Sequence, residues 1–396
     1  MLTPVIGGMG GAQMFVYNKA NYLAQKGWNV IICYTADRPV LINGILDFKC
    51  IYVPEIAYGI QYYSTWQVRN IIQKISSKID ICGFEEIVIE SHLCILSLWG
   101  EALAEAMKAK HIVNFLEEDV PSFNKNAISF FEYKLKRWEC LNASEQSLRR
   151  LFKEDYKEEY NSYNHVTTFY CSNVMEDSPV DPKIVLPDSN SFNILSIGRL
   201  NKPYIKTVIS EVFDFAEKNK DINIALVFVG ASPDGSVEID ILAKSSILSN
   251  VKVYFMGYMY PIPLKIIKCA DIAICSSNSV LVPFECGIPT ISVDANDYYA
   301  IGIYGVNTNN TVFRNDEPMI PIGHYVKQLY NGEITSKSSF QNANNDADSF
   351  NDQIKFLHKS QIDYNYYNIY DIYSYPEIIV CVIKRLVSYI IKPIKS

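Results

Sequence analysis

Short apolar runs alternate with amphipathic stretches from one end of the chain to the other. In the first half the continuous runs are Val30–Tyr34, Cys50–Val53, Ile87–Ser91 and Ile112–Leu116. Uninterrupted runs of this length are typical of parallel strands that are buried on both faces. Stretches with helical spacing lie between them, chiefly Gln13–Lys26, which Gly27 closes, and Leu93–Lys110. The first half is therefore predicted to form an α/β layer.

The second half repeats this rhythm. Its apolar runs are Phe192–Ile197, Ile222–Val229, Val251–Phe255, Ile272–Cys275 and Thr290–Val293. Helical spacing is found at about Ile205–Lys218 and Ile239–Ser246. A chain of 396 residues is longer than one hydrophobic core usually serves, and 49% apolar residues are enough for two cores. We therefore expect an α/β protein of two doubly wound domains.

Prolines separate the two halves. Pro179, Pro182 and Pro187 interrupt any regular element between Ser172 and Asp188. This punctuation predicts an N-terminal domain over residues 1–175 and a C-terminal domain over residues 190–332. Residues 333–368 are rich in Asn, Asp and Ser and then in Tyr, which predicts an insertion, and we expect its segment Gly332–Asp352 to be exposed and mobile.

Residues 369–396 carry an apolar stripe at helical spacing. Ile378, Val382 and Leu386 belong to the stripe, whereas Lys384 and Arg385 lie off it. Such a helix either packs on the protein or holds it peripherally on an anionic membrane surface. Both uses are kept as expectations.

Charge and cysteine usage narrow the class of protein. A net charge of −7 argues against nucleic acid as the main partner, because a surface that follows phosphates needs a basic excess. The ten cysteines include no CxxC pair, and Cys33, Cys94 and Cys275 lie within apolar runs, as expected of free thiols in a reducing cytoplasm.

The sequence predicts neither a transmembrane helix nor a signal peptide. No run of eighteen apolar residues is present, and no basic region precedes the first apolar residues. We therefore expect a cytoplasmic protein, with membrane association as a variant. Met1–Val5 is short for a first strand, so an upstream start is a further expectation.

Two segments of the second half place cations and small polar residues after apolar strands. The first strand ends in Gly198-Arg199-Leu200, and Lys206 follows closely. About seventy residues later another strand leads into Ser277-Asn278-Ser279 and then Glu285-Cys286-Gly287-Ile288-Pro289. A nucleotide-sugar diphosphate carries two negative charges beside the bond that breaks, so an enzyme without a metal needs fixed cations and helix amino ends there.

These two segments resemble the donor-binding half of a GT-B glycosyltransferase, in particular the retaining family 4 enzymes of bacterial polysaccharide synthesis. The resemblance implies two Rossmann-like domains that face each other across a cleft, with the last helix packed back on the N-terminal domain. It implies catalytic roles for Arg199 and Lys206 and donor binding by Ser277, Asn278 and Ser279. It also implies a nucleotide-sugar donor, a glycan or lipid-linked acceptor, and no metal or other cofactor.

Further donor contacts follow from the same resemblance. Gly257 and Tyr258 match the strand-end turn whose backbone contacts the base in that family. The family's paired glutamates before Cys-Gly-x-Pro are not reproduced, because the loop is about six residues shorter and the equivalent position holds Val282. Glu285 is the nearest carboxylate and is a candidate for the ribose contact.

A glycine-rich turn follows the first strand at Gly7-Gly8-Met9-Gly10-Gly11-Ala12-Gln13. A dinucleotide fingerprint fails here, because the third glycine would fall on Gln13. The turn resembles instead the GGA-Glu loop of family 4 enzymes, which implies that Gly10, Gly11 and Gln13 contact the donor. A plain structural turn before a helix is the alternative.

Two further positions lie where strands of the first domain end. Ile89-Glu90-Ser91-His92 resembles the family's strand that ends in His, and Glu117 takes the place of the histidine that ends the next strand. Open α/β sheets bind ligands at this edge, so His92 and Glu117 are candidate catalytic residues. A buried structural histidine and a solvated acidic pair of Glu117 and Glu118 are the alternatives.

The sequence as a whole favours a metal-independent glycosyltransferase that uses a UDP- or GDP-sugar in surface polysaccharide assembly. A GT-A enzyme would need an Asp-x-Asp at a strand end, and Asp346-Ala347-Asp348 is the one clear example. Serine-hydrolase, HExxH and P-loop motifs are missing from the sequence. A GT-B-type sugar-nucleotide epimerase and a catalytically silent scaffold subunit stay as alternatives.

Overall fold

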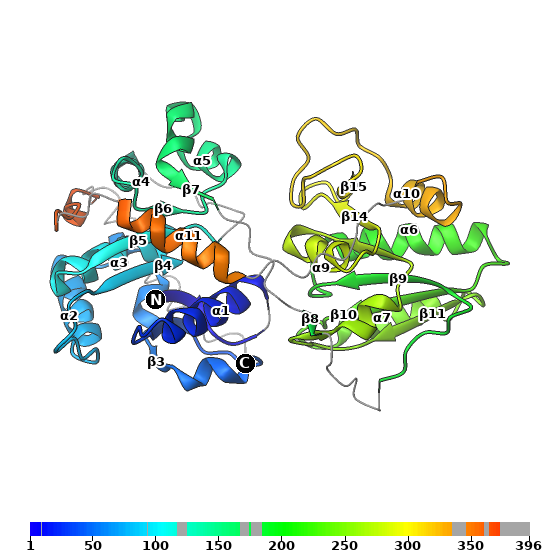
Figure 1. The fold of residues 1–396 in the computed structure, drawn as a ribbon, viewed down its shortest axis with the longest axis horizontal. Helices are drawn as coiled ribbons and strands as arrows, with labels where there is room; N and C mark the ends of the chain where they lie inside the picture. The colour runs from blue at the N-terminus through cyan, green and yellow to red at the C-terminus, as the bar shows by residue number, and fades with distance from the viewer. Residues whose placement is uncertain are drawn as a thin grey trace. The chain divides into compact units, whose positions relative to one another are not determined.

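The computed structural model describes residues 1–8, 10–92, 94–116, 125–166, 174–175, 184–334, 346–359 and 364–372. The chain divides into two compact units. Unit 1 comprises residues 1–168 and 347–396, and unit 2 comprises residues 169–346. Both are α/β layers, as the alternating pattern predicted, and the two units are coloured along the chain in Figure 1.

Unit 1 is built on a parallel sheet of seven strands in the order β3-β2-β1-β4-β5-β6-β7. The strands are β1 (Leu2–Val5), β2 (Ile31–Ala36), β3 (Lys49–Tyr52), β4 (Val88–His92), β5 (Lys110–Asn114), β6 (Cys140–Leu141) and β7 (Asn164–His165). The helices are α1 (Gly11–Gln25), α2 (Thr65–Ser76), α3 (Cys94–Met107), α4 (Lys125–Lys136), α5 (Glu145–Phe152) and α11 (Asp346–Lys359). The order reverses between β1 and β4, which makes that gap the topological switch point where such sheets bind ligands.

Local sequence explains where these helices begin and end. Gly27 has a φ of +87°, and its N–H donates to Ala24 O over 3.0 Å, so it ends α1 as predicted. Ser64 and Gln67 form a reciprocal capping box at the start of α2. Ser144 caps α5 by accepting from the Ser147 N–H.

Unit 2 contains a six-stranded sheet in the order β11-β10-β9-β13-β14-β15, in which only β15 is antiparallel to its neighbour. Its strands are β9 (Phe192–Ile197), β10 (Ile224–Val229), β11 (Val251–Phe255), β13 (Ile272–Cys275), β14 (Thr290–Val293) and β15 (Ala300–Ile303). A two-stranded sheet joins β8 (Val174–Met175) to β12 (Ile262–Pro263). The helices are α6 (Tyr204–Lys218), α7 (Ser236–Ser245), α8 (Leu264–Lys268), α9 (Leu281–Glu285) and α10 (Ile322–Tyr330).

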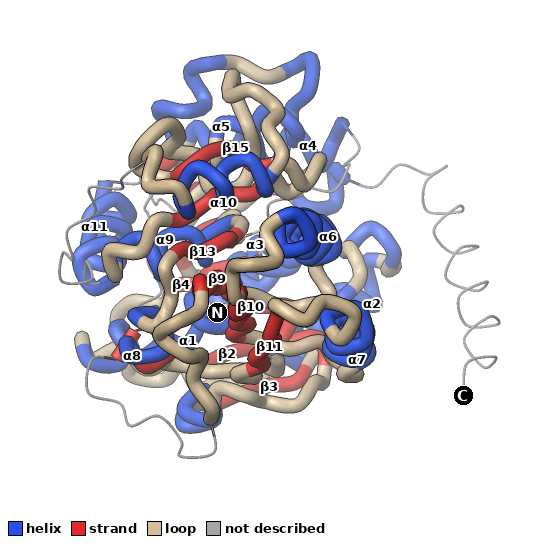
Figure 2. The backbone as a smooth tube through the Cα atoms, turned by 90° about the vertical axis from the view of Figure 1, so that its right-hand side faces the viewer, coloured by secondary structure: helices blue, strands red, loops and turns tan. Residues whose placement is uncertain are grey.

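Apolar side chains fill both faces of the unit 2 sheet. Side chains of α6, α7 and α10 form one core with it, and side chains of α8 and α9 contribute to another. The helices α6 and α10 lie side by side, and the Gly323 N–H donates to Glu211 across them over 3.0 Å (Figure 2). The switch point of this sheet lies between β9 and β13.

The structure corrects the prediction for residues 333–368. The segment Gly332–Asp352 is not exposed throughout, because α11 spans Asp346–Lys359 and packs within unit 1. Phe350, Gln353 and Phe356 are buried on one side of this helix. Their helical spacing was hidden among Asn and Asp residues, and the two phenylalanines supply the apolar contacts that hold the helix.

The chain therefore joins unit 1 again before residue 369. Ile369 and Ile372 are both buried in the unit 1 core, and the Tyr367 N–H donates to Glu101 over 2.8 Å. Most of the predicted last helix, 369–396, lies outside the described residues. The predicted cleft between the two domains stays a prediction.

Candidate functional site

The carboxyl edge of the unit 2 sheet is free of side chains at three neighbouring strand ends. Gly198, Gly230 and Gly257 follow β9, β10 and β11, and all three have a positive φ. The Gly230 N–H donates to Gly257 O over 2.8 Å, and a Cβ on Gly230 would come within 2.0 Å of Gly198 O. Only glycine fits at position 230, so the three turns lie close together with bare backbone.

Polar groups surround this glycine edge. Arg199 is exposed directly after Gly198, and the Tyr258 hydroxyl donates to Ala231 O over 2.9 Å. Burial raises the pKa of Tyr258, while the nearby Arg199 charge opposes that rise. Glu238 accepts from the Ser232 N–H over 2.7 Å and from its hydroxyl. The structure thus brings Arg199, Gly257 and Tyr258 together at one edge of the sheet, and their contact with a donor stays a prediction.

Lys206 lies in the first turn of α6 and is exposed. The turn before this helix is tight, because the Lys202 N–H donates to Arg199 O over 3.2 Å and the Lys206 N–H donates to Pro203 O over 3.3 Å. Arg199 and Lys206 are both exposed. Arg199 lies in the turn after β9, and Lys206 lies in the helix that follows this turn.

The serine turn of residues 276–280 leads from β13 into α9. Residues Ser277–Val280 form a short 3₁₀ turn, and Ser277 has a φ of +60°. The Ser277 N–H donates to Thr311 O over 2.6 Å and the Ser279 hydroxyl donates to Ser276 O over 2.7 Å. Both donors are therefore used within the protein and do not face a position where an anion could bind. Asn278 is exposed and is the most accessible member of the turn.

Glu285 is half-buried at the end of α9. The neighbouring Cys286 carbonyl accepts from Lys268 over 2.5 Å. Burial raises the pKa of the Cys286 thiol to about 11, with Lys268 opposing and Glu285 adding to the rise. The carboxylate of Glu285 therefore lies in a partly enclosed position, and its predicted ribose contact stays a prediction.

In unit 1 the glycine turn packs on the loop that follows β2. The Gly8 N–H donates to Pro39 O over 2.7 Å, and a Cβ on Gly7 would come within 2.1 Å of Arg38 O. Gly8 has a φ of +78°, which favours glycine. Gly10 is extended and caps α1, whereas Gly11 is exposed with open space around it. The positions that require glycine for structure are therefore Gly7 and Gly8.

This result sharpens the site prediction for the turn. A structural need for glycine at Gly10 or Gly11 is weak, since the only contact of a Cβ at Gly10 would be with the flexible Gln13 side chain at 2.9 Å. Gln13 itself is half-buried in the first turn of α1. These three residues are therefore free to meet a ligand without disturbing the core.

His92 ends β4 and is fully buried. Its Nε2 lies 2.9 Å from Glu90 Oε1, and Glu90 also accepts from Lys19 Nζ over 2.6 Å and from Asn114 over 2.8 Å. Burial alone would raise the pKa of Glu90, but Lys19 and His92 together hold it well below its ordinary value. Burial lowers the pKa of His92 below its ordinary value, with Glu90 opposing that shift.

Lys19 and Glu90 were missed at the level of sequence. The signal was present, because Lys19 occurs four residues after Phe15 on the buried face of α1, and Glu90 lies within an apolar run. A charge at a core position indicates a buried partner. The other candidate of this edge, Glu117, lies outside the described residues, as does Glu118.

A second buried network lies on the other face of the same sheet. His111 Nδ1 is 2.6 Å from Glu101, and His111 Nε2 is 2.9 Å from the Ser91 hydroxyl. Lys134 donates to Glu101 over 3.0 Å and also pairs with Glu139. The Ser-His-Glu order is that of a hydrolase triad, but the polar atoms of all three side chains are paired with other groups inside the protein, so the network is structural.

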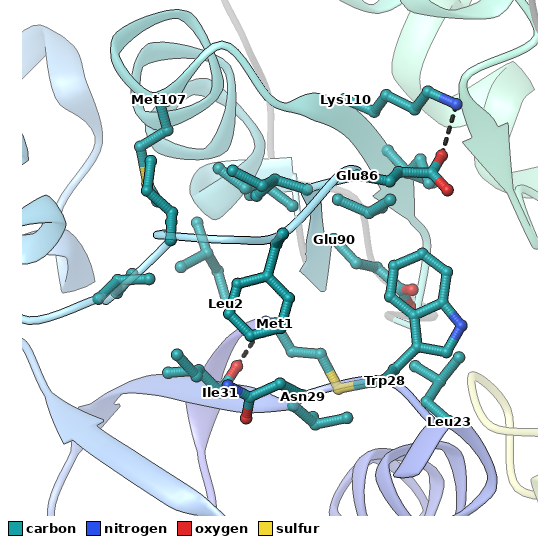
Figure 3. A pocket seen from close by; sticks show the side chains of 18 of the residues that line it. Met1, Leu2, Leu23, Trp28, Asn29, Ile31, Glu86, Glu90, Met107 and Lys110 are labelled. Carbon is teal, nitrogen blue, oxygen red and sulfur yellow. Dashed lines mark hydrogen bonds and ion pairs between the residues drawn. The ribbon is translucent and has the colours of Figure 1, made fainter. Parts of the chain in front are cut away.

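A cavity lined mainly by apolar side chains lies at the opposite, amino-terminal edge of the unit 1 sheet. It has a volume of about 390 Å³ and is lined by Leu23, Trp28, Met107 and other apolar side chains (Figure 3). The Met1 amine donates to Ile31 O over 2.7 Å at its wall, and Lys110 pairs with Glu86 at its rim. Ligands of open α/β sheets bind at the carboxyl edge, whereas this cavity reaches the sheet from the amino-terminal edge. It touches the His92 network through Lys19 and Glu90, which also line it.

Two further expectations concern metals and membranes. The described residues contain no group of three His, Cys, Asp or Glu side chains placed to hold a metal ion. Asp346 and Asp348 lie in the first turn of α11 and not at a strand end, which contradicts the GT-A alternative. Within the described part of the chain, none of the helices has the length and apolar character needed to cross a bilayer.

Comparison with known proteins supports the fold. Anabaena HepE, solved with UDP and glucose, matches with a TM-score of 0.60 at 13% identity over 91% of this chain and 98% of its own. A glycosyltransferase from Rickettsia africae matches with a TM-score of 0.57 at 14% identity over 100% and 98%. A Listeria monocytogenes protein provisionally described as a UDP-N-acetylglucosamine 2-epimerase matches with a TM-score of 0.50 at 12% identity over 92% and 96%.

No protein-family model matches the sequence, and no curated protein matches it either. The structural matches span nearly the full length of both partners, so the fold is that of GT-B glycosyltransferases. Membership in the retaining family 4 stays a prediction.

Proposed function

We propose that this chain is a metal-independent glycosyltransferase that moves a sugar from a UDP- or GDP-sugar to a glycan or lipid-linked acceptor. The observation that carries the proposal is the carboxyl edge of unit 2, where bare glycine turns adjoin the exposed Arg199. A nucleotide can approach backbone groups there without meeting a Cβ, and the cation lies beside that approach. Anabaena HepE, the structural neighbour solved with UDP and glucose, supports the same donor class.

In this proposal Arg199 and Lys206 neutralise the diphosphate as it leaves. Charge develops on the leaving group in the transition state, and a fixed cation stabilises it without reorganisation. Gly257 and Tyr258 hold the base, while Asn278, the exposed member of the serine turn, approaches the phosphates and Glu285 the ribose.

The residues proposed for unit 1 act on the sugar. Gly10, Gly11 and Gln13 admit it without a blocking side chain, and His92 and Glu117 orient the acceptor hydroxyl. Retention of configuration, surface polysaccharide assembly and a cytoplasmic location are parts of the same proposal. Peripheral membrane contact through residues 369–396 is included as the route to a lipid-linked acceptor.

A panel of nucleotide sugars tests the proposal through protection against thermal unfolding. A ligand present at a hundred times its dissociation constant stabilises the folded chain by about 2.7 kcal/mol. We expect one UDP- or GDP-sugar to raise the melting temperature, and the same compound to give transfer in the presence of a lipid or glycan acceptor mixture. Absence of protection by every member of the panel would leave the silent scaffold as the better description.

An epimerase is the second candidate, because the Listeria neighbour shares this fold over most of both chains. The two activities differ in what they need. An epimerase changes the configuration of the donor sugar with no acceptor present, whereas a transferase releases the nucleoside diphosphate. Proton NMR of the nucleotide sugar during incubation with the protein distinguishes these outcomes.

A further inference from the structure

The two ring nitrogens of His92 are used unequally. Nε2 lies 2.9 Å from Glu90 Oε1. Nδ1 is buried and has no hydrogen-bond partner among the described residues. A buried polar atom without a partner carries a free-energy cost, so its persistence points to a use.

Lys19 and Glu90 decide which nitrogen carries the proton. The Lys19 ammonium lies 2.6 Å from Glu90 Oε2, and both side chains are almost fully buried. Asn114 donates to the other carboxylate oxygen over 2.8 Å. An ionised carboxylate only accepts hydrogen bonds, so His92 must donate from Nε2. A neutral ring then has a free lone pair on Nδ1.

The position of His92 suits a ligand contact. It ends β4, which borders the switch point between β1 and β4. The ring of Phe15, from the second turn of α1, packs against it with the centroids 5.7 Å apart. The glycine turn that precedes α1 therefore approaches the same strand end, where sheets of this kind hold their ligands.

We propose that Lys19 and Glu90 are positioning residues that fix His92 in the Nε2–H tautomer, so that Nδ1 accepts a hydrogen bond from a hydroxyl of the bound sugar substrate. The substrate half of this inference rests on the proposed function. The tautomer half does not, because it follows from the buried contacts of the free protein alone.

His111 provides an internal reference of opposite type. Its Nδ1 lies 2.6 Å from Glu101, which Lys134 and the Tyr367 N–H also contact. Its Nε2 lies 2.9 Å from the Ser91 hydroxyl, which can donate to it. His111 must therefore carry its proton on Nδ1, the reverse of His92.

Long-range ¹H–¹⁵N NMR of histidine-labelled protein measures both tautomers in one spectrum. The signals are assigned with His92→Asn and His111→Asn variants. In the wild type near neutral pH we expect His92 protonated on Nε2 and His111 protonated on Nδ1. A His92 protonated on Nδ1, or on both nitrogens, would overturn the proposal without any change to the network.

The variant Glu90→Gln tests the control exerted by the carboxylate. The introduced amide can direct either its oxygen or its NH₂ group toward Lys19. The oxygen should face Lys19, because an NH₂ group there would be repelled by the ammonium. This preference should outweigh the opposite one of the Asn114 amide, which also favours an oxygen. The NH₂ group then faces His92, which must accept at Nε2 and move its proton to Nδ1. Glu101→Gln is the matched control and should alter the signals of His111 alone.

Transfer measured on the same proteins closes the argument. Glu90→Gln should lower turnover roughly 10- to 100-fold, the range typical of changing the hydrogen-bond partner that orients a metal-ligating histidine. An inverted tautomer with unchanged turnover would overturn the substrate contact. A wild type that has the expected tautomers but transfers no sugar from the panel would refute the proposed function and support the tautomer assignment.

Discussion

Unit 1 and unit 2 display opposite chemistry at the ends of their central strands. In unit 1 the ends of β4 and β5 carry His92 and Asn114, which are buried and bonded to Glu90. In unit 2 glycines follow the strands β9, β10 and β11, and Arg199 is exposed beside the first of them. Buried charges hold their neighbours in one arrangement, whereas an exposed cation next to bare backbone is available to a ligand.

The same contrast separates stability from binding. The networks of unit 1 lie in the core, between the sheet and the helices that cover its faces. Removing one member therefore leaves another charge buried without an opposite charge. Removal of Arg199 in unit 2 leaves no buried charge unpaired, because its side chain is exposed to water. Substitutions in the two units should therefore change different measurable quantities.

The largest expected effect on stability comes from Lys134→Ala in unit 1. Lys134 is fully buried between Glu101 and Glu139, and burial alone would lower its pKa, but the two carboxylates raise it above the ordinary value. Its removal leaves two carboxylates buried and should cost about 3–5 kcal/mol of unfolding free energy. Urea denaturation followed by tryptophan fluorescence measures this.

Lys136→Ala is the control on the same helix. Lys136 pairs with Glu132 at the surface over 2.8 Å and should change stability by about 0.5 kcal/mol or less. Equal losses in the two variants would show that the buried network of Lys134 has no special weight.

Arg199→Ala in unit 2 should act on catalysis instead. The loss of one preorganised charge beside a developing anion costs about 3–4 kcal/mol, which lowers turnover by roughly two to three orders of magnitude. The melting temperature should stay unchanged, because Arg199 is exposed. Steady-state transfer and thermal unfolding of the variant are the measurements.

The matched control is Lys244→Ala, which removes an exposed cation of unit 2 that pairs with Asp240 at i,i+4. Lys206→Ala should resemble Arg199→Ala, and Lys202→Ala should matter less. Wild-type turnover in Arg199→Ala would remove this residue from the site.

Acid should weaken unit 1 before unit 2. Burial, with Lys134 adding to it, lowers the pKa of His111 to about 4, below its ordinary value of 6.5. The unfolded chain then binds a proton that the folded chain refuses, so stability falls as the pH drops from 6.5 toward 4, by about 3 kcal/mol in all. Burial raises the pKa of Glu101, but Lys134 and His111 lower it to about 2, so its contribution is lost between 4.5 and 2.

The four tryptophans of the chain make this measurable for unit 1 alone. Trp28, Trp66, Trp99 and Trp138 all belong to residues 1–168. Their fluorescence should report denaturation midpoints that fall steadily between pH 6.5 and pH 4. His111→Asn should flatten this slope, and a slope of equal size in that variant would contradict the assignment.

The glycine turn of unit 1 separates structural from functional positions. Gly8→Ala forces a left-handed conformation on a residue with a side chain and should cost about 1–2 kcal/mol of stability. Gly11→Val has open space around its side chain and should leave the melting temperature unchanged. It should nevertheless abolish transfer while leaving nucleotide affinity within a few-fold. Unchanged transfer in Gly11→Val would remove the turn from the site.

The smallest expected effect is that of chelation. The proposed site relies on fixed cations in unit 2, so turnover should persist in excess EDTA. Complete loss of activity that Mn²⁺ restores would refute metal independence and require a carboxylate site outside the present proposal.

The sequence determined the layer structure because buried parallel strands need continuous apolar runs. The strands Phe192–Ile197, Val251–Phe255, Ile272–Cys275 and Thr290–Val293 match the prediction residue for residue. The exposed cation after β9 and the glycine that ends α1 were likewise evident locally, since both depend on residues next to one another in the chain.

Only the tertiary structure decided which polar groups meet. Lys19 and Gln353 are bonded over 2.8 Å although 334 positions separate them, and Glu90 lies 71 positions from Lys19. Gly230 was not singled out in the sequence, because its need for glycine arises from Gly198 O on the neighbouring strand. Apolar patterning acts along the chain, whereas the pairing of buried charges and the approach of backbones depend on packing between elements that the sequence does not place side by side.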